Sequence, residues 1–274
     1  MTTRIRMGVA LGELGRAARR ANPQLVPTRA KLDEFCAALS KSTDLEVTPY
    51  AAPRYDRLLK RLHLAEVELA WLPPLLALTA LGRDARPVAL PIRAHSPWFW
   101  AALFTHPESD IEKLTDLPRA AAAWVDAQSA SGYLVIRAAL RADGIDPDRA
   151  FASEQFYQSH AAVVRAVLAN RNTVGATYFH LGDDGEPTSA GWGAAEVRVL
   201  KRAGPIPGDV LAASRTLGDH VIVSIAKAMT EAPSVALSAS ARGLFAADRF
   251  VAPEASHRAH LDALARYLLR ERLR

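Results

Sequence analysis

Two short segments of the sequence place hydroxyl and imidazole groups where a predicted strand passes into a predicted helix. The first is Ser-Ala-Ser-Gly at residues 129–132, between the apolar run AAAAWV and a helical pattern that ends at Gly144. The first turn of a helix leaves several backbone N–H groups without partners, and the helix dipole adds partial positive charge there. With small side chains around it, such a turn suits a carboxylate or a tetrahedral oxyanion. A purely structural role is the alternative, in which Ser129 or Ser131 caps the helix.

The second segment repeats this arrangement. Phe156 and Tyr157 end a predicted strand, Ser159 is at the cap position, and His160 opens an apolar helix. In a doubly wound sheet both helix starts lie beyond the carboxyl ends of parallel strands, which is the usual place for a ligand. The helix dipole favours the neutral form of His160 and a bound anion favours the charged form, and either form can donate a hydrogen bond. The alternative is a partly buried ring that is hydrogen-bonded to its own loop.

Strands and helices alternate along the chain, which predicts an α/β fold of two doubly wound lobes with parallel strands. A second series of elements begins near residue 96, and 274 residues suffice for two lobes. Strands are predicted at residues 4–10, 45–51, 67–72, 85–94, 120–125, 153–157, 173–181 and 196–204. Helices are predicted at residues 28–43, 54–65, 75–84 and 158–172, and further helices are expected to begin within 109–117 and 205–232. A polar turn is predicted at 182–191 and a linker at 249–256.

Composition argues against several classes of protein. Lys and Arg number 34 against 29 Asp and Glu, a formal charge of +5. This mild, dispersed excess favours a small anion over a nucleic acid, which needs clustered basic and aromatic residues. Cys36 is the single cysteine, so no disulfide forms within the chain, and its apolar context predicts a buried thiol. No run approaches the ~20 apolar residues of a membrane span, so no membrane insertion is expected.

Localisation depends on the leader. The sequence as written shows no leader peptide before its first strand. This predicts a cytoplasmic protein, or a periplasmic or extracellular one if a leader has been removed.

Catalytic and metal-binding patterns are weaker. Ser129 with His160 would make a nucleophile and base, but no orienting acid is evident nearby in the sequence, so no catalytic residue is predicted. His257 and His260 are three residues apart, and a metal site needs more ligands than two. The sequence has no nucleophile elbow, HEXXH pattern or dinucleotide-binding glycine fingerprint. We therefore expect neither a cofactor nor a metal.

An ordered set of segments resembles the phosphate/phosphite/phosphonate-binding proteins of ABC importers, which have the type 2 periplasmic-binding fold. The resemblance covers residues 4 to 268, nearly the whole chain. The segments that carry it are YDRLL from Tyr55, VELAWLPP ending at Pro74, SASGYL from Ser129, GIDP from Gly144, QSHAAVVRAV from Gln158, VGAT from Val174 and GPIP from Gly204.

The resemblance implies two α/β lobes joined by a two-strand hinge, with the ligand held between them. Lobe one would comprise residues 1–94 and 201–274, and lobe two, inserted into it, residues 95–200. The ligand-binding residues that it implies are Tyr55 on lobe one, Trp98 or Phe99 after the crossover, Ser129, Ala130 and Ser131 in an anion loop, and His160. Gly132, which keeps the approach to this loop open, completes the predicted site.

Departures from the family pattern bear on the ligand. Ala130 replaces a threonine of the anion loop, and Pro73 replaces a glycine and removes a backbone N–H. Ala161 and Thr173 stand where the family has acidic residues, which argues against an aminoalkylphosphonate. Fewer polar donors favour a ligand with fewer oxygens or a more apolar body, and the aromatic run 98–100 could line its cavity. The alternative is that alternate members of this run are core.

The first hypothesis is therefore a solute-binding protein of an ABC importer that closes on a small anion and delivers it to a permease. The alternative is a cytosolic sensor or enzyme on the same fold, which binds a small carboxylate or a phosphorylated metabolite. A third hypothesis, an interaction module, depends only on the basic segments at 16–20 and 266–274.

Overall fold

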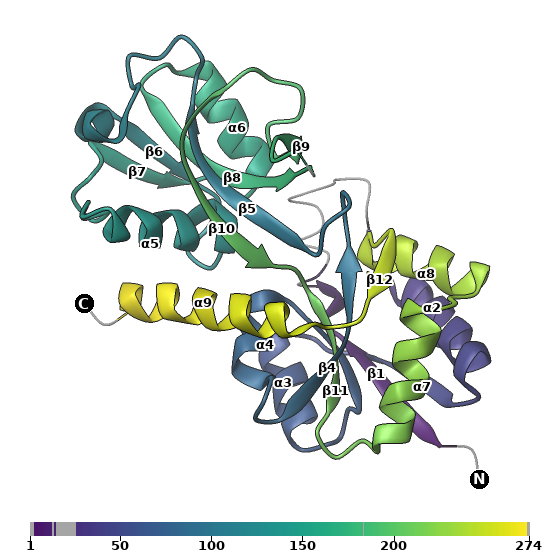
Figure 1. The fold of residues 1–274 in the computed structure, drawn as a ribbon. Helices are drawn as coiled ribbons and strands as arrows, with labels where there is room; N and C mark the ends of the chain where they lie inside the picture. The colour runs from purple at the N-terminus through teal and green to yellow at the C-terminus, as the bar shows by residue number, and fades with distance from the viewer. Residues whose placement is uncertain (1–2, 13, 15–25, 183, 273–274) are drawn as a thin grey trace. The chain divides into compact units, whose positions relative to one another are not determined.

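The computed structural model describes residues 3–12, 14, 26–182 and 184–272, so the basic segment 16–20 lies outside the described residues. The chain divides into two compact units (Figure 1). Unit 1 comprises Met1–Pro97 with Gly208–Arg258, and unit 2 comprises Trp98–Pro207 with Ala259–Arg274. The chain passes between the units at residues 97–98 and 207–208, whereas the lobe boundaries predicted from the sequence are 94–95 and 200–201. The residues from Ala259 onward fall in unit 2.

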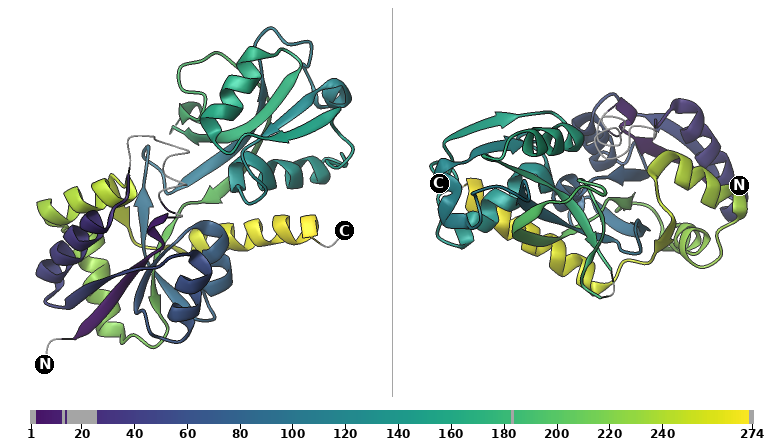
Figure 2. Two further views of the ribbon diagram at one scale, coloured as in Figure 1. Left: turned by 180° about the vertical axis from the view of Figure 1, so that it is seen from behind. Right: turned by 90° about the horizontal axis from the view of Figure 1, so that it is seen from above.

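Unit 1 is a six-stranded sheet with the strand order β12-β4-β11-β3-β1-β2. Helices α2, α7 and α8 cover one face of the sheet, and α3 and α4 cover the other (Figures 1 and 2). On the first face Trp71 stacks on Phe245 with ring centroids 3.8 Å apart. The strands are β1 (Arg4–Val9), β2 (Glu46–Ala51), β3 (Leu69–Leu72), β4 (Ala85–Ile92), β11 (Val210–Ser214) and β12 (Arg249–Val251). The helices are α2 (Arg29–Thr43), α3 (Tyr55–His63), α4 (Pro74–Ala80), α7 (Asp219–Thr230) and α8 (Val235–Phe245), and α9 (Ala255–Arg272) begins in this unit.

Unit 2 has a sheet with the strand order β10-β5-β8-β6-β7, and β9 pairs with β8. Helix α6 packs closely on β8. A Cβ atom at Gly175 would lie only 2.7 Å from Val163 Cγ1 and Val167 Cγ2, so only glycine fits there. Helix α5 contacts β10 and β5. The strands are β5 (Trp98–Thr105), β6 (Ala121–Trp124), β7 (Ser153–Phe156), β8 (Thr173–Leu181), β9 (Pro187–Ala190) and β10 (Arg198–Pro207). The helices are the 3₁₀ helix η1 (Leu114–Arg119), the π-helical turn η2 (Ala130–Leu134), α5 (Val135–Ala142) and α6 (His160–Ala169).

The predicted α/β class is confirmed, and the predicted parallel strands occur in both sheets, which also contain antiparallel pairs. Parallel pairing joins β1 to β2 and β3, and β6 to β7 and β8. In unit 1, β11 lies between β3 and β4 and is antiparallel to both. The chain leaves this unit through β4 and returns through β11, so the returning strand runs in the opposite direction.

Three local predictions also need correction. The helix expected within 109–117 is the 3₁₀ helix η1, which contains Pro118. The predicted turn at 182–191 holds strand β9, and the predicted linker at 249–256 holds strand β12. Both strands are short, at 4 and 3 residues. Strand β9, within the predicted turn region, pairs with the preceding strand β8, whereas β12 pairs with the distant strand β4, which local sequence patterns do not reveal.

Among the described helices, none taken singly has the length and apolar composition of a membrane span. Helices α7 and α8 together have this length and composition, but the two helices are bent by 87° relative to each other.

Cys36 is buried on α2, and burial raises the pKa of its thiol to about 12. Because the thiolate is the reactive form, we expect no reaction with a disulfide reagent at pH 8 in the folded protein. Unfolding in guanidinium should release one reactive thiol per chain, as measured by absorbance of the released chromophore. Rapid labelling of the native protein would contradict this assignment.

Candidate functional site

The two predicted helix starts lie on neighbouring junctions at the carboxyl ends of β6 and β7. These strands are parallel neighbours, with Trp124 opposite Phe156. Beyond the strands, Tyr157 N–H donates to the Trp124 carbonyl and Gln158 N–H donates to the Val125 carbonyl, both at 2.8 Å. The junction of η2 and the junction of α6 are therefore hydrogen-bonded to each other along the backbone.

The Ser-Ala-Ser-Gly segment forms the start of η2, and its helix opens with a π turn. Ser129 Oγ accepts a hydrogen bond from Gly132 N–H at 3.1 Å, so the capping role of Ser129 is correct. A hydroxyl that accepts a bond keeps its own O–H donor, so capping and ligand binding are compatible. Ser131 is only 4% exposed. Ala130 follows the cap and its carbonyl accepts from Val135 N–H, which closes the turn.

Gly132 is required by close packing. A Cβ atom there would lie 2.3 Å from Val125 Cγ2 and 2.8 Å from Ser129 Oγ. The Gly132 carbonyl also accepts from Val125 N–H at 3.2 Å. The turn thus packs directly against the residue that follows β6, and there is no room for a side chain at position 132.

His160 opens α6, and its ring is hydrogen-bonded to the sheet. Its Nδ1 lies 2.8 Å from Thr177 Oγ1 on β8, and Thr177 is fully buried. The imidazole also packs edge-on against the Tyr178 ring, with centroids 5.0 Å apart. These contacts fix the plane of the ring, and when Thr177 donates, a neutral imidazole carries its proton on Nε2. Ser159 caps the helix by accepting from Ala162 N–H at 3.2 Å.

Gln158, directly before this cap, has a φ of +64°. This left-handed conformation is uncommon for residues other than glycine. It is held by the Gln158 N–H bond to Val125, so the pairing of the junctions stabilises a strained residue at the start of α6.

The buried guanidinium of Arg137 packs against η2. Arg137 on α5 is 3% exposed, and its Nη1 donates to Glu154 Oε2 at 2.7 Å. The same carboxylate oxygen accepts from Trp124 Nε1 at 2.7 Å. The Arg137 guanidinium lies over the ring of Tyr133, a residue of the turn, 4.9 Å from its centroid. One charge pair therefore joins β6, β7, α5 and the turn.

Asp148 provides a second carboxylate for this guanidinium. It pairs with Arg137 and accepts a hydrogen bond from Arg141 at 2.8 Å. The Arg141 hydrogen bond, followed by the charges of Arg137 and Arg141, holds the pKa of the Asp148 carboxyl below its usual range. The pair thus remains ionised at neutral pH.

Thr177 and Tyr178 were missed by the sequence analysis. Pairing between β6 and β8 ends at Ala123 and Gly175, so β8 continues past the end of β6. Residues 177 and 178 therefore pass beside the two junctions. Tyr178 is half-buried, and burial raises the pKa of its phenol. The signal in the sequence was a hydroxyl and an aromatic residue directly after the apolar run VGA.

The aromatic run at the start of β5 is half-buried. Trp98 packs edge-on against His260 at 4.5 Å between centroids, and Phe99 lies 6.3 Å from His180. Trp100 packs on Phe179 at 6.2 Å, on the face of the sheet that α6 covers, as alternation along a strand requires.

Tyr55 belongs to unit 1. It is half-buried at the first residue of α3, just beyond the carboxyl end of β2. The next helix start in this unit, at α4, carries Pro73 and Pro74, neither of which has a backbone N–H. Of the ligand-binding residues predicted from the sequence, Tyr55 is the one that lies in unit 1.

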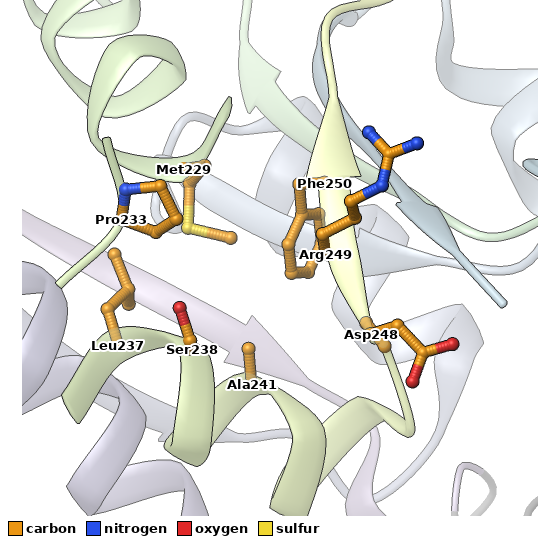
Figure 3. Close-up of a pocket in the computed structure, with 9 residues that line it drawn as sticks. Met229, Pro233, Leu237, Ser238, Ala241, Asp248, Arg249 and Phe250 are labelled. Atoms are coloured by element: carbon orange, nitrogen blue, oxygen red, sulfur yellow. The ribbon is translucent and has the colours of Figure 1, made fainter. Parts of the chain in front are cut away.

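Other places in the described structure are poorer candidates. A pocket among α7, α8 and β12, lined largely by apolar side chains, offers about 10 Å³, enough for about one water molecule (Figure 3). Within the described residues, no three His, Cys, Asp or Glu side chains gather in a way that could hold a metal ion.

The sequence profile of a known family matches residues 22–258, most of the chain. The family is described as "ABC transporter, phosphonate, periplasmic substrate-binding protein". This chain belongs to that family. The phosphonate-binding family is one of transporter components rather than enzymes. No curated protein matches the chain.

Solved structures share the fold of this family member at low sequence identity. A protein of Xanthomonas citri solved with bound chloride has a TM-score of 0.71 and 18% identity, with 98% of each chain covered. PhnD1 of Prochlorococcus marinus, solved with methylphosphonate, has a TM-score of 0.61 and 16% identity, with 97% of this chain and 98% of that chain covered. The periplasmic aliphatic sulphonate-binding protein SsuA of Escherichia coli has a TM-score of 0.55 and 15% identity, with 100% and 89% covered.

Replacing Gly132 with alanine should distort the turn at residues 129–132. The added methyl must displace Val125 or Ser129, which costs about 1–3 kcal/mol of unfolding free energy by overpacking. We expect a lower midpoint in chemical denaturation. Gly243→Ala is the matched control, because a Cβ at this helical position meets nothing within 4 Å. That variant should be as stable as the wild type or more stable by up to about 1 kcal/mol. If both variants change the unfolding free energy equally, the close packing of Gly132 against Val125 is not what limits this position.

Proposed function

We propose that this substrate-binding protein takes a small oxyanion, such as a phosphonate, phosphate or sulphonate, at the two helix starts of unit 2. The observation that carries the proposal is the backbone pairing of the two junctions, because it places the N–H groups and dipoles of both helix starts at one edge of the sheet. A permease of an ABC importer is the partner that family membership implies, and the family description favours a periplasmic location.

The ligand contacts that we propose follow the geometry of unit 2. The hydroxyl groups of Ser129 and Ser131, the backbone of Ala130 and Gly132, and the His160 ring supply the donors. His160 suits this role because Thr177 and Tyr178 hold its ring in one orientation.

Aromatic side chains complete the proposed site. Tyr55 and Trp98 or Phe99 are proposed as further ligand contacts.

Known ligands of similar structures support an anion. The similar proteins of X. citri and P. marinus were solved with chloride and with methylphosphonate, and SsuA binds aliphatic sulphonates. These ligands share a negative charge and differ in shape. Anionic recognition by helix starts is compatible with all of them, because N–H donors bind charge with little demand on geometry.

Alanine at Ser129, Ser131 or His160 should weaken binding of methylphosphonate by about 1–3 kcal/mol each, the range for a lost hydrogen bond to a charged group. Titration calorimetry measures this directly. Ser234→Ala is the matched control, because Ser234 caps α8 in unit 1 by accepting from Leu237 N–H at 3.2 Å.

The control separates capping from ligand binding. Ser129→Ala and Ser234→Ala should each lower the unfolding free energy by about 1 kcal/mol through loss of a cap. Only Ser129→Ala should lower the affinity for methylphosphonate. Unchanged affinity in the triple variant of Ser129, Ser131 and His160 would refute the site.

A further inference from the structure

A row of rings extends from His160 across the sheet of unit 2. The His160 ring meets the Tyr178 ring edge-on at 5.0 Å, and Tyr178 meets His180 edge-on at 6.1 Å. His180 then lies 6.3 Å from Phe99 on β5. We call His160, Tyr178, His180 and Phe99 the aromatic row.

The register of the strands explains why these rings meet. Tyr178 and His180 are two residues apart on β8, so both side chains leave the same face of the sheet. In the antiparallel pairing of β5 with β8, Trp100 lies opposite Phe179, and the preceding Phe99 therefore comes beside His180. Phe179 points to the opposite face, where it packs on Trp192 at 6.2 Å.

The row is accessible. Phe99, Tyr178 and His180 are half-buried, whereas the core aromatics of this unit, such as Phe104 and Phe179, are at most 1% exposed. A half-buried row of rings in edge contact leaves ring surface that another ring can cover in an offset or edge-on geometry.

The chemistry of the row selects among ligand bodies. Two of its four rings are imidazoles, and a protonated imidazole repels a cationic ligand body. Ala161, directly after His160 in α6, carries no charge that would compensate a cationic body. A planar uncharged ring gains stacking contacts along the row that an alkyl group of the same size does not.

We propose that the ligand is an oxyanion joined to an aromatic or heteroaromatic ring, an aryl phosphonate being the simplest case. The oxyanion binds at η2 and His160, and the ring lies on Tyr178, His180 and Phe99. This inference rests on the proposed function, since His160 belongs both to the anion site and to the row.

The test compares phenylphosphonate with methylphosphonate by titration calorimetry, because the two share a head group and differ in the ring. The wild type should bind phenylphosphonate at least about 10-fold more tightly, which corresponds to one good aromatic contact. In Phe99→Leu and His180→Leu the preference should fall below about 3-fold, and in His180→Leu the affinity for methylphosphonate should stay within about 2-fold. Tyr178 stands between His180 and His160 in the row, so the His180 variant tests the ring and not the head group.

Trp192→Leu is the matched control. It removes a half-buried aromatic side chain that packs on Phe179 and Phe104, on the other face of the sheet, and it should keep the wild-type preference. Thermal melts establish that each variant is folded, and the wild-type preference decides the question if a variant is not.

The possible failures are distinguishable. If neither anion binds the wild type, the proposed function fails, and this inference fails with it. If methylphosphonate binds and phenylphosphonate binds no more tightly, only the aromatic subsite is overturned. A preference that survives both leucine variants overturns the assignment of the subsite to the row.

Discussion

The pairing of two strand-to-helix junctions is the constraint on which the candidate site depends. Tyr157 N–H and Gln158 N–H donate to carbonyl groups just beyond β6, so β7 and its helix cannot shift relative to the turn after β6. Helix dipoles act over about one turn, and two helix starts cooperate only when something holds them together. Here the backbone does so, and side chains such as Ser129 and Ser159 only complete each cap.

Side-chain packing against η2 also restricts how far this turn can move. A buried guanidinium is costly unless it is fully paired, and Arg137 meets Glu154, Asp148 and the Tyr133 ring. The turn that carries Ser129 and Ser131 is therefore supported by a charge network below and by the Gly132 contact with Val125. Such a turn presents its donors already oriented, which reduces the ordering cost of binding.

The site that we propose has few polar side chains. Ala130, Pro73 and Ala161 lie within its segments and carry none. The remaining donors lie next to rings, since His160 itself packs against Tyr178. Recognition would therefore combine a few fixed donors with a large apolar contact, as in most small-molecule sites.

Most of the fold could be predicted because its longer elements carry strong local patterns. Apolar periodicity located α2, α6 and β8, and Ser-Ala-Ser-Gly and Ser159 marked two helix starts through their own chemistry. Strand β12 escaped prediction because its partner β4 lies far away in the sequence, and β9 because its four residues lie among turn-forming residues directly after β8. In the same way the sequence alone determined which residues could bind an anion. Only the tertiary structure decided that Thr177 holds His160, because that contact depends on how far β8 runs past the end of β6, and register between distant strands leaves no local pattern.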